Sequence, residues 1–199
     1  MKTALKIATR LLVLAALALP FVPAPARAQA VYFTPRELLA DFFPQSAKVG
    51  YRQFDLPEGC STRQAIEQRL GYRLPRERYT VYVATTAGHV DGYAFFDDEA
   101  GQHLPITFAV KVSPGGVALR QEVVAYREAR GDEVRDARFR AQFVGKTAQD
   151  RLRAGDDVAV VSGATISSRA MATGVKRALV LVDELVLRPE RAATATARR

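Results

Sequence analysis

The sequence predicts an α+β fold: an antiparallel β-meander sheet packed by a long C-terminal helix, with short N-terminal helices. Two pairs of apolar or alternating segments, 79–86 with 89–96 and 106–112 with 117–126, are separated by short turns that contain glycine, as in β-hairpins. From Ile166 to Leu187, apolar residues recur at helical spacing in a wide stripe. Four consecutive strands with short loops favour a meander, and the stripe predicts one helix lying on the sheet.

The other predicted elements are short. A Thr-Pro pair, which suits a helix cap and first turn, precedes a helix over 36–43. A second helix spans 61–70, with Ser61 as its cap and a glycine after its end. A short charged helix is expected over 135–143. After Pro189 the chain has no core-forming residues, which predicts a disordered tail over 189–199.

Residues 1–30 have the layout of a cleaved secretory signal peptide. Three basic residues come first, then the apolar run Leu11–Leu19, and then small-residue cleavage sites within Ala26–Ala30. The alternative is a retained membrane anchor, but this run is well short of the roughly 20 residues that span a bilayer. We therefore expect an exported, periplasmic or otherwise extracytoplasmic protein, with residues 31–188 as its one domain.

Composition excludes several classes of function. Removing the four basic residues of the signal lowers the formal charge from +8 to about +4, and that charge is dispersed, unlike the basic face of a nucleic-acid binder. Cys60 is the single cysteine, so neither an internal disulfide nor an iron–sulfur cluster can form. His89 and His103 have no metal-ligand partners at useful spacing. A redox cofactor of this chain must therefore be organic.

The segment Ser162-Gly163-Ala164-Thr165-Ile166-Ser167-Ser168 lies where the apolar residues 158–161 meet the expected long helix. Small residues let an anion approach the backbone closely. Free amides and the positive end of the helix dipole favour a phosphate there. The residues alone predict a phosphate site that contains the Thr165 hydroxyl. An ordinary side-chain-capped helix is the alternative, because Ser and Thr are common cap residues.

This segment resembles the signature of the FMN-binding domain family, which includes flavin subunits of Rnf and sodium-pumping NADH:quinone oxidoreductases. Further similarity to stand-alone exported members lies in 105–108, 126–134 and 142–146, and the resemblance extends over about 79–187. It implies FMN esterified through its phosphate to Thr165. It also implies a partner that makes this bond, a Mg-dependent flavin transferase that consumes FAD. The family usually has an acid where this chain has Ala159.

The resemblance implies further cofactor-binding residues. Those around the threonine are Ser162, Gly163, Ala164, Ile166, Ser167 and Ser168. Tyr126 is a candidate neighbour of the isoalloxazine, and Arg127 and Glu128 are candidates for contact with the ring or the phosphate. The structural alternative for these three is a surface aromatic beside an ion pair. Lys146 is a candidate counter-ion of the phosphate, with a solvated lysine as its alternative.

These observations predict an exported flavoprotein that carries FMN on Thr165 and relays electrons between membrane or periplasmic redox partners. We expect a carrier more than an enzyme with its own substrate. One alternative is an exported flavin-dependent reductase of a small molecule. The other is a flavin-free interaction module that retains the fold, which the alanine at position 159 keeps open. No nucleic-acid partner is expected.

Overall fold

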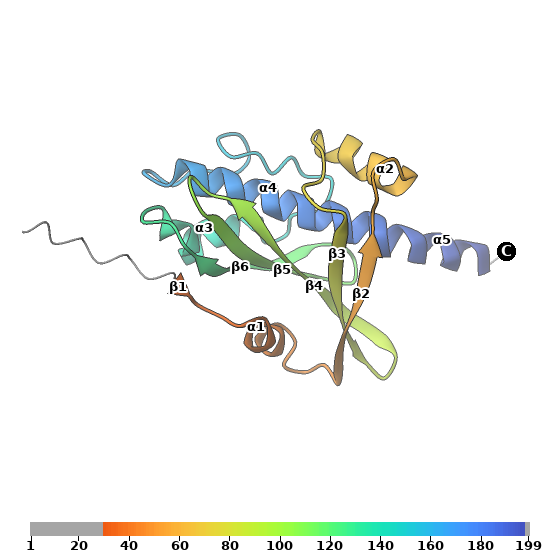
Figure 1. The fold of residues 1–199 in the computed structure, drawn as a ribbon. Coiled ribbons are helices and arrows are strands. Elements are labelled where there is room, and N and C mark those ends of the chain that lie inside the picture. Colours follow the sequence, from red (N-terminus) through yellow and green to blue (C-terminus); the bar gives the residue numbers. More distant parts are fainter. Residues whose placement is uncertain (1–29, 198–199) are drawn as a thin grey trace, which may run out of the picture.

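The computed structural model describes residues 30–197 (Figure 1). The expected signal peptide lies outside these residues, except for Ala30. The strands are β1 (Ala30–Val31), β2 (Lys48–Asp55), β3 (Arg78–Thr86), β4 (His89–Ala100), β5 (Pro105–Val112) and β6 (Ala118–Tyr126). The helices are α1 (Pro35–Phe42), α2 (Ser61–Leu70), η1 (Asp132–Arg135), α3 (Ala137–Arg140), η2 (Ala141–Phe143), α4 (Thr165–Val182), the π-helical η3 (Asp183–Leu187) and α5 (Arg188–Ala197).

All strand pairs are antiparallel, in the order β1-β6-β5-β4-β3-β2. The α+β class and the predicted meander of four strands are therefore confirmed. Ala87 and Gly88, between β3 and β4, both have positive φ, which matches the twist of a tight hairpin. The sequence did not predict β1 and β2. β2 is an edge strand whose side chains are mostly exposed, so it lacks the apolar alternation that marks a half-buried strand.

The sheet is covered on both faces (Figure 1). α4 lies across one face, where Phe95, Phe108 and Met171 are fully buried in the larger core cluster. α1 covers part of the other face with Leu38 and Phe42, in a smaller cluster. Within the described part of the chain, no helix is long and apolar enough to span a membrane.

The close approach of α4 to the sheet depends on Gly174. A Cβ atom at this position would lie 2.6 Å from the Phe108 ring and 3.0 Å from the Glu99 side chain. Real Cβ atoms are essentially never that close to a ring carbon. Gly174 therefore lets the helix pack directly on β4 and β5.

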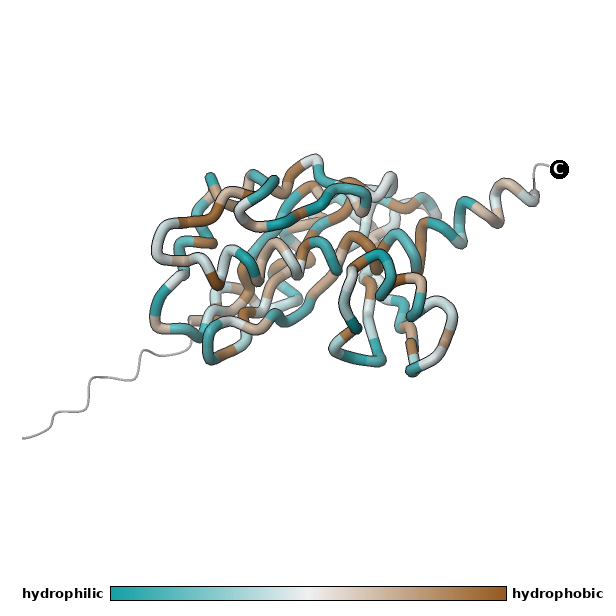
Figure 2. Tube along the Cα trace, turned by 90° about the horizontal axis from the view of Figure 1, so that it is seen from above, coloured by the Kyte–Doolittle hydropathy of each residue, from teal (hydrophilic) through white to brown (hydrophobic). Residues whose placement is uncertain are grey.

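The structure differs from two predictions at helix ends. The cap of α2 is Cys60, whose Sγ accepts a hydrogen bond from the Arg63 amide, and Ser61 is the first helical residue. Residues 188–197 form α5 and not a disordered tail; in Figure 2 this helix projects from the body. Pro189 is the second residue after the wide π-helical turn of η3, which replaces the regular α-helical turn that a proline would disrupt. The alanine-rich sequence beyond Pro189 favours helix.

Candidate functional site

The turn that precedes α4 has a glycine-dependent backbone. Gly163 has a φ of 79°, in the left-handed region that favours glycine. The Ala164 amide donates a 3.0 Å hydrogen bond to the Val161 carbonyl and closes the turn. Ala164 is the N-cap residue of α4, and its methyl group is buried. The methyl side chain of an alanine in this position cannot accept a hydrogen bond from the helix amides, as a Ser, Thr, Asp or Asn cap would.

The first turn of α4 is consequently open to a ligand. No side chain caps this helix, so the alternative of an ordinary side-chain cap is wrong. Within residues 30–197, the amides of Thr165, Ile166 and Ser167 have no hydrogen-bond acceptor. The Thr165 side chain is exposed beside them. Free amides at the positive end of a long helix dipole form a site that suits a phosphate, and the threonine places a hydroxyl there.

Ser168 fixes this turn to the helix. Its hydroxyl donates a 2.9 Å hydrogen bond to the Ala164 carbonyl and accepts one of 3.1 Å from the Val161 amide. The side chain is fully buried. Ser168 therefore holds the backbone of the phosphate site in place from inside the protein.

Ser167 joins the site to the sheet. Its Oγ lies 2.7 Å from the Tyr126 hydroxyl, which in turn donates to the Arg130 carbonyl. Tyr126 is only 3% exposed, and this burial raises the pKa of its hydroxyl, with the Ser167 hydrogen bond opposing the shift. Tyr126 thus couples the end of β6 to the first turn of α4. Its role beside an isoalloxazine ring stays a prediction.

Arg127 contacts the start of β5, and Glu128 contacts the loop between β4 and β5. Arg127 donates to the Pro105 carbonyl at 3.0 Å and to the Thr107 hydroxyl at 2.8 Å. Glu128 accepts hydrogen bonds from the backbone amides of His103 and Leu104. Partial burial raises the pKa of the Glu128 carboxyl, but these amide hydrogen bonds outweigh it, so the pKa is lower than usual. Glu128 thus anchors the loop and Arg127 holds the start of β5, and contact of either residue with a cofactor stays a prediction.

Lys146 faces carboxylates of the loop before α4. Its Nζ lies 3.7 Å from Asp150 and 3.8 Å from Asp157. Asp157 also accepts hydrogen bonds from the amides of Leu152 and Arg153. Lys146 and Asp157 thus both make contacts that stabilise this loop. A role of Lys146 as counter-ion of a phosphate remains a prediction.

A cavity of about 450 Å³ lies beside Ala159. Gln142 holds Ala159 in place, since its amide group donates to the Ala159 carbonyl and accepts from the Ala159 amide. Phe139 and Val160 add apolar surface, and Asp136 adds a carboxylate. Sequence reasoning missed Phe139, Gln142 and Asp136 as site residues. Nothing in the spacing of these residues indicates that the 136–142 segment packs against the residues before α4.

Apolar surface is also exposed next to the open turn. Val160 is 42% exposed and Ile166 is 45% exposed, on either side of Gly163. A flavin has a phosphate at one end and a flat, largely apolar ring system at the other. Free amides, open space around Gly163 and exposed apolar side chains together fit such a molecule. Within the described residues, no group of three or more His, Cys, Asp or Glu side chains could hold a metal ion.

The fold and this turn define an α+β domain with free amides and an uncapped, glycine-containing turn at the start of its long helix. Residues 101–180 match the family model of the FMN-binding domain. This match confirms the resemblance to the FMN-binding domain family that the signature at 162–168 predicts. The match lies within the range 79–187 over which the sequence resembles the family.

Two further comparisons concern known proteins and structures. The crystal structure of NqrC from Shewanella oneidensis is similar, with 17% sequence identity and a TM-score of 0.47. The similarity covers 72% of this chain and 82% of that chain. No curated protein matches the sequence.

Proposed function

We propose that this chain is an exported flavoprotein that carries FMN on Thr165 and relays electrons in an extracytoplasmic redox chain. One observation carries the assignment of Thr165: its exposed hydroxyl stands beside free amides at a helix start that no side chain caps. The FMN-binding domain match covers this segment. When bound, FMN supplies one- and two-electron redox chemistry, and the protein controls the exposure and the potential of the ring.

The attachment step requires a separate enzyme. Thr165 Oγ would form a bond to the FMN phosphorus of FAD, the phosphoanhydride bond would break, and AMP would leave while the hydroxyl loses its proton. A threonine hydroxyl is a weak nucleophile without a positioned base. Within the described residues, the Thr165 hydroxyl has no hydrogen bond to a side-chain base. A flavin transferase that acts on the exposed turn is therefore the expected partner.

The residues of the turn would then hold the phosphate without taking part in redox chemistry. The amides of Thr165, Ile166 and Ser167 point out of the helix start and would donate to phosphate oxygens. Ser168 and the Ser167–Tyr126 pair keep these amides in position. Covalent attachment suits an exported carrier, because a dissociating cofactor would be lost by dilution outside the cell.

The test is to produce the exported protein with and without a flavin transferase. We expect the loaded protein to remain yellow and fluorescent after denaturation, with a mass increase of one FMN less one water. Thr165→Ala should abolish both signals, and Thr165→Ser should retain them because it keeps the hydroxyl. Since Thr165 is exposed, either variant should unfold within about 1 kcal/mol of the parent.

Thr62→Ala is the matched control, because Thr62 is also an exposed threonine in the first turn of a helix and lies in α2, outside this site. It should load as the parent does. Flavin that separates completely on denaturation would contradict the covalent bond, and attached flavin in Thr165→Ala would contradict the assignment of Thr165. A protein that binds no flavin in any form would favour the flavin-free module.

A further inference from the structure

A second cavity, of about 630 Å³, lies between α2, the loop 149–154 and α4. Cationic side chains dominate its lining, which contains no carboxylate: Arg69, Arg151, Arg153, Arg169 and Lys176. Leu70, Tyr72 and Leu152 supply apolar and aromatic surface. Its size is within the range of pockets for small organic ligands. It has no lining residue in common with the cavity beside Ala159.

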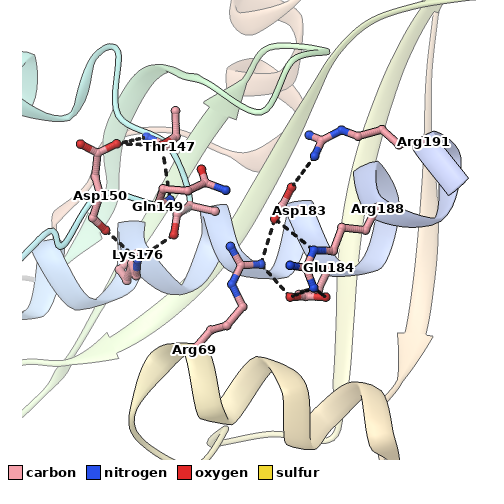
Figure 3. A network of polar contacts seen from close by, with 10 residues as sticks. Arg69, Thr147, Gln149, Asp150, Lys176, Asp183, Glu184, Arg188 and Arg191 are labelled. Atoms are coloured by element: carbon pink, nitrogen blue, oxygen red, sulfur yellow. Dashed lines mark hydrogen bonds and ion pairs between the residues drawn. The ribbon is translucent and has the colours of Figure 1, made fainter.

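Two of the five cations are neutralised by ion pairs. Arg69 Nη1 lies 2.8 Å from Asp183 and 2.7 Å from Glu184, the two acids of the π-helical segment (Figure 3). Arg151 lies 2.8 Å from Asp156. These two arginines are therefore committed to contacts within the protein.

The other three cations lack a directly paired carboxylate. Lys176 Nζ donates to the backbone carbonyls of Ala148 and Asp150, at 2.7 and 2.6 Å (Figure 3). The side chains of Arg153 and Arg169 have no hydrogen bond or ion pair with any described residue. Positive charge that gathers in a concave surface without neutralisation attracts anions.

Lys176 and Tyr72, which both line the cavity, have few negatively charged or polar groups around them. Burial lowers the pKa of Lys176, and the nearby positive charge of Arg69 lowers it further, against the weaker pull of Asp150 and Asp157. The Tyr72 hydroxyl is buried and has no hydrogen-bond partner among the described residues. Burial raises its pKa, and the charge of the neighbouring Arg177 opposes that shift.

The cavity begins one helical turn after Thr165. Arg169 and Thr173 follow Thr165 at intervals of four residues on α4, so the three side chains lie in one row. Arg169 therefore lies one helical turn beyond Thr165 and lines the cavity together with Thr173. The cavity is thus a neighbour of the proposed flavin site and separate from the amides that form it.

We propose that this cavity binds a small organic anion with two or more negative charges. Arginine side chains bind carboxylate and phosphate groups through paired hydrogen bonds, and Arg153 and Arg169 are the two that are free to do so. Lys176 lies deeper and adds a point charge. Di- and tricarboxylates and phosphorylated compounds share this chemistry. Binding of this anion would not require FMN, because all the residues that line the cavity are present in the flavin-free protein.

The test is titration calorimetry on flavin-free protein purified without a transferase, at constant ionic strength. Citrate and pyrophosphate are the two multiply charged probes, and acetate is the singly charged comparison. We expect one anion per protein, and binding of the stronger probe at least about tenfold tighter than that of acetate. The better of the two probes distinguishes a carboxylate ligand from a phosphate ligand.

The double variant Arg153→Gln with Arg169→Gln should weaken binding by about tenfold or more. Arg36→Gln with Arg138→Gln is the matched control, since it removes the same charge from exposed residues outside this cavity. It should change binding by less than about twofold. All four arginines are exposed, so neither double variant should change the melting temperature of the protein. Absence of saturable binding, or equal losses in the two double variants, would overturn the proposal, and either result leaves the test of Thr165 unaffected.

Discussion

At the scale of single residues, the hydroxyl groups of the turn before α4 and of its first turn fall into two classes. Ser167 and Ser168 are buried, and their hydroxyls bond Tyr126 and the turn backbone. Ser162 and Thr165 are exposed. A modifying enzyme can reach only the exposed pair, and Thr165 alone is inside the helix start, next to the free amides. Accessibility and the amide positions together support the proposal that Thr165 is the attachment residue.

Gly163 offers a test of the backbone of this turn. Its φ of 79° is unfavourable for residues with a branched side chain, whereas a Cβ atom there would meet nothing within 4 Å. We therefore expect Gly163→Val to reduce flavin loading strongly and to destabilise the fold by about 1–2 kcal/mol through backbone strain. Asparagine tolerates the left-handed region, so Gly163→Asn should fold like the parent.

Loading of the two Gly163 variants by a transferase, measured as protein-bound fluorescence after denaturation, separates strain from crowding. If Gly163→Asn loads normally, flavin loading requires the left-handed backbone conformation at residue 163 and not the absence of a side chain. If it folds normally and fails to load, close approach of the phosphate to residue 163 is required. Normal loading of Gly163→Val would contradict any special role of this glycine.

The phosphate site was predictable from sequence only in part. The signature at 162–168 indicates a helix start with small residues and a hydroxyl, and the structure has all three. The absence of a side-chain cap was not predictable, because Ser162 and Thr165 are both good cap residues. The Tyr126–Ser167 contact depends on how α4 docks on the sheet, and no local pattern specifies the distance between residues 41 positions apart.

At the scale of elements, α4 and the meander were predictable because their buried faces require apolar residues at regular intervals along the sequence. β2 was not, since an edge strand with exposed side chains has no such period. The tail after Pro189 was predicted wrongly for a related reason. Exposed helices carry no apolar stripe, and α5 is held in part by polar contacts, with Glu190 paired to Arg52 at 2.8 Å and bonded to the Tyr93 hydroxyl at 3.1 Å.

The contact between α5 and the sheet predicts a dependence of stability on alkaline pH. Burial raises the pKa of Tyr93 to about 12, and the negative charge of Glu190 adds to the shift. A pKa raised on folding means that the contribution of neutral Tyr93 is fully present below the unfolded value of about 10. That contribution is lost as the pH rises toward 12.

We therefore expect the free energy of unfolding of the parent to fall more steeply between about pH 10 and pH 12 than that of Tyr93→Phe. Urea titrations at several pH values measure this difference. Tyr51→Phe is the control, because Tyr51 is 66% exposed. Parallel pH profiles of the parent and Tyr93→Phe would show that the Tyr93 hydroxyl does not couple ionisation to folding.

At the scale of the whole molecule, the proposed flavin site is close to Ala30, the first residue that the structure describes. Ala30 in β1 pairs with Tyr126, and the Tyr126 hydroxyl contacts Ser167 in the first turn of α4. In Figure 1, β1 and the start of α4 lie at the same end of the molecule, and α5 leaves from the other.

The pairing of Ala30 in β1 bears on the N-terminus expected after export. The small-residue sites predict a mature N-terminus at Gln29 or Val31. Cleavage before Val31 would remove Ala30 and with it the pairing to Tyr126, whereas cleavage before Gln29 leaves β1 whole. We therefore expect an N-terminus at Gln29 or Val31 when the protein is isolated from its native host and sequenced, and only the chain that begins at Gln29 can form the whole of β1. Ala28→Arg should block that cleavage and leave a longer, membrane-retained product, because signal peptidase requires a small residue there. Recovery of the parent from the cytoplasm with Met1 intact would contradict export, and the electron-carrier proposal would then have to be placed inside the cell.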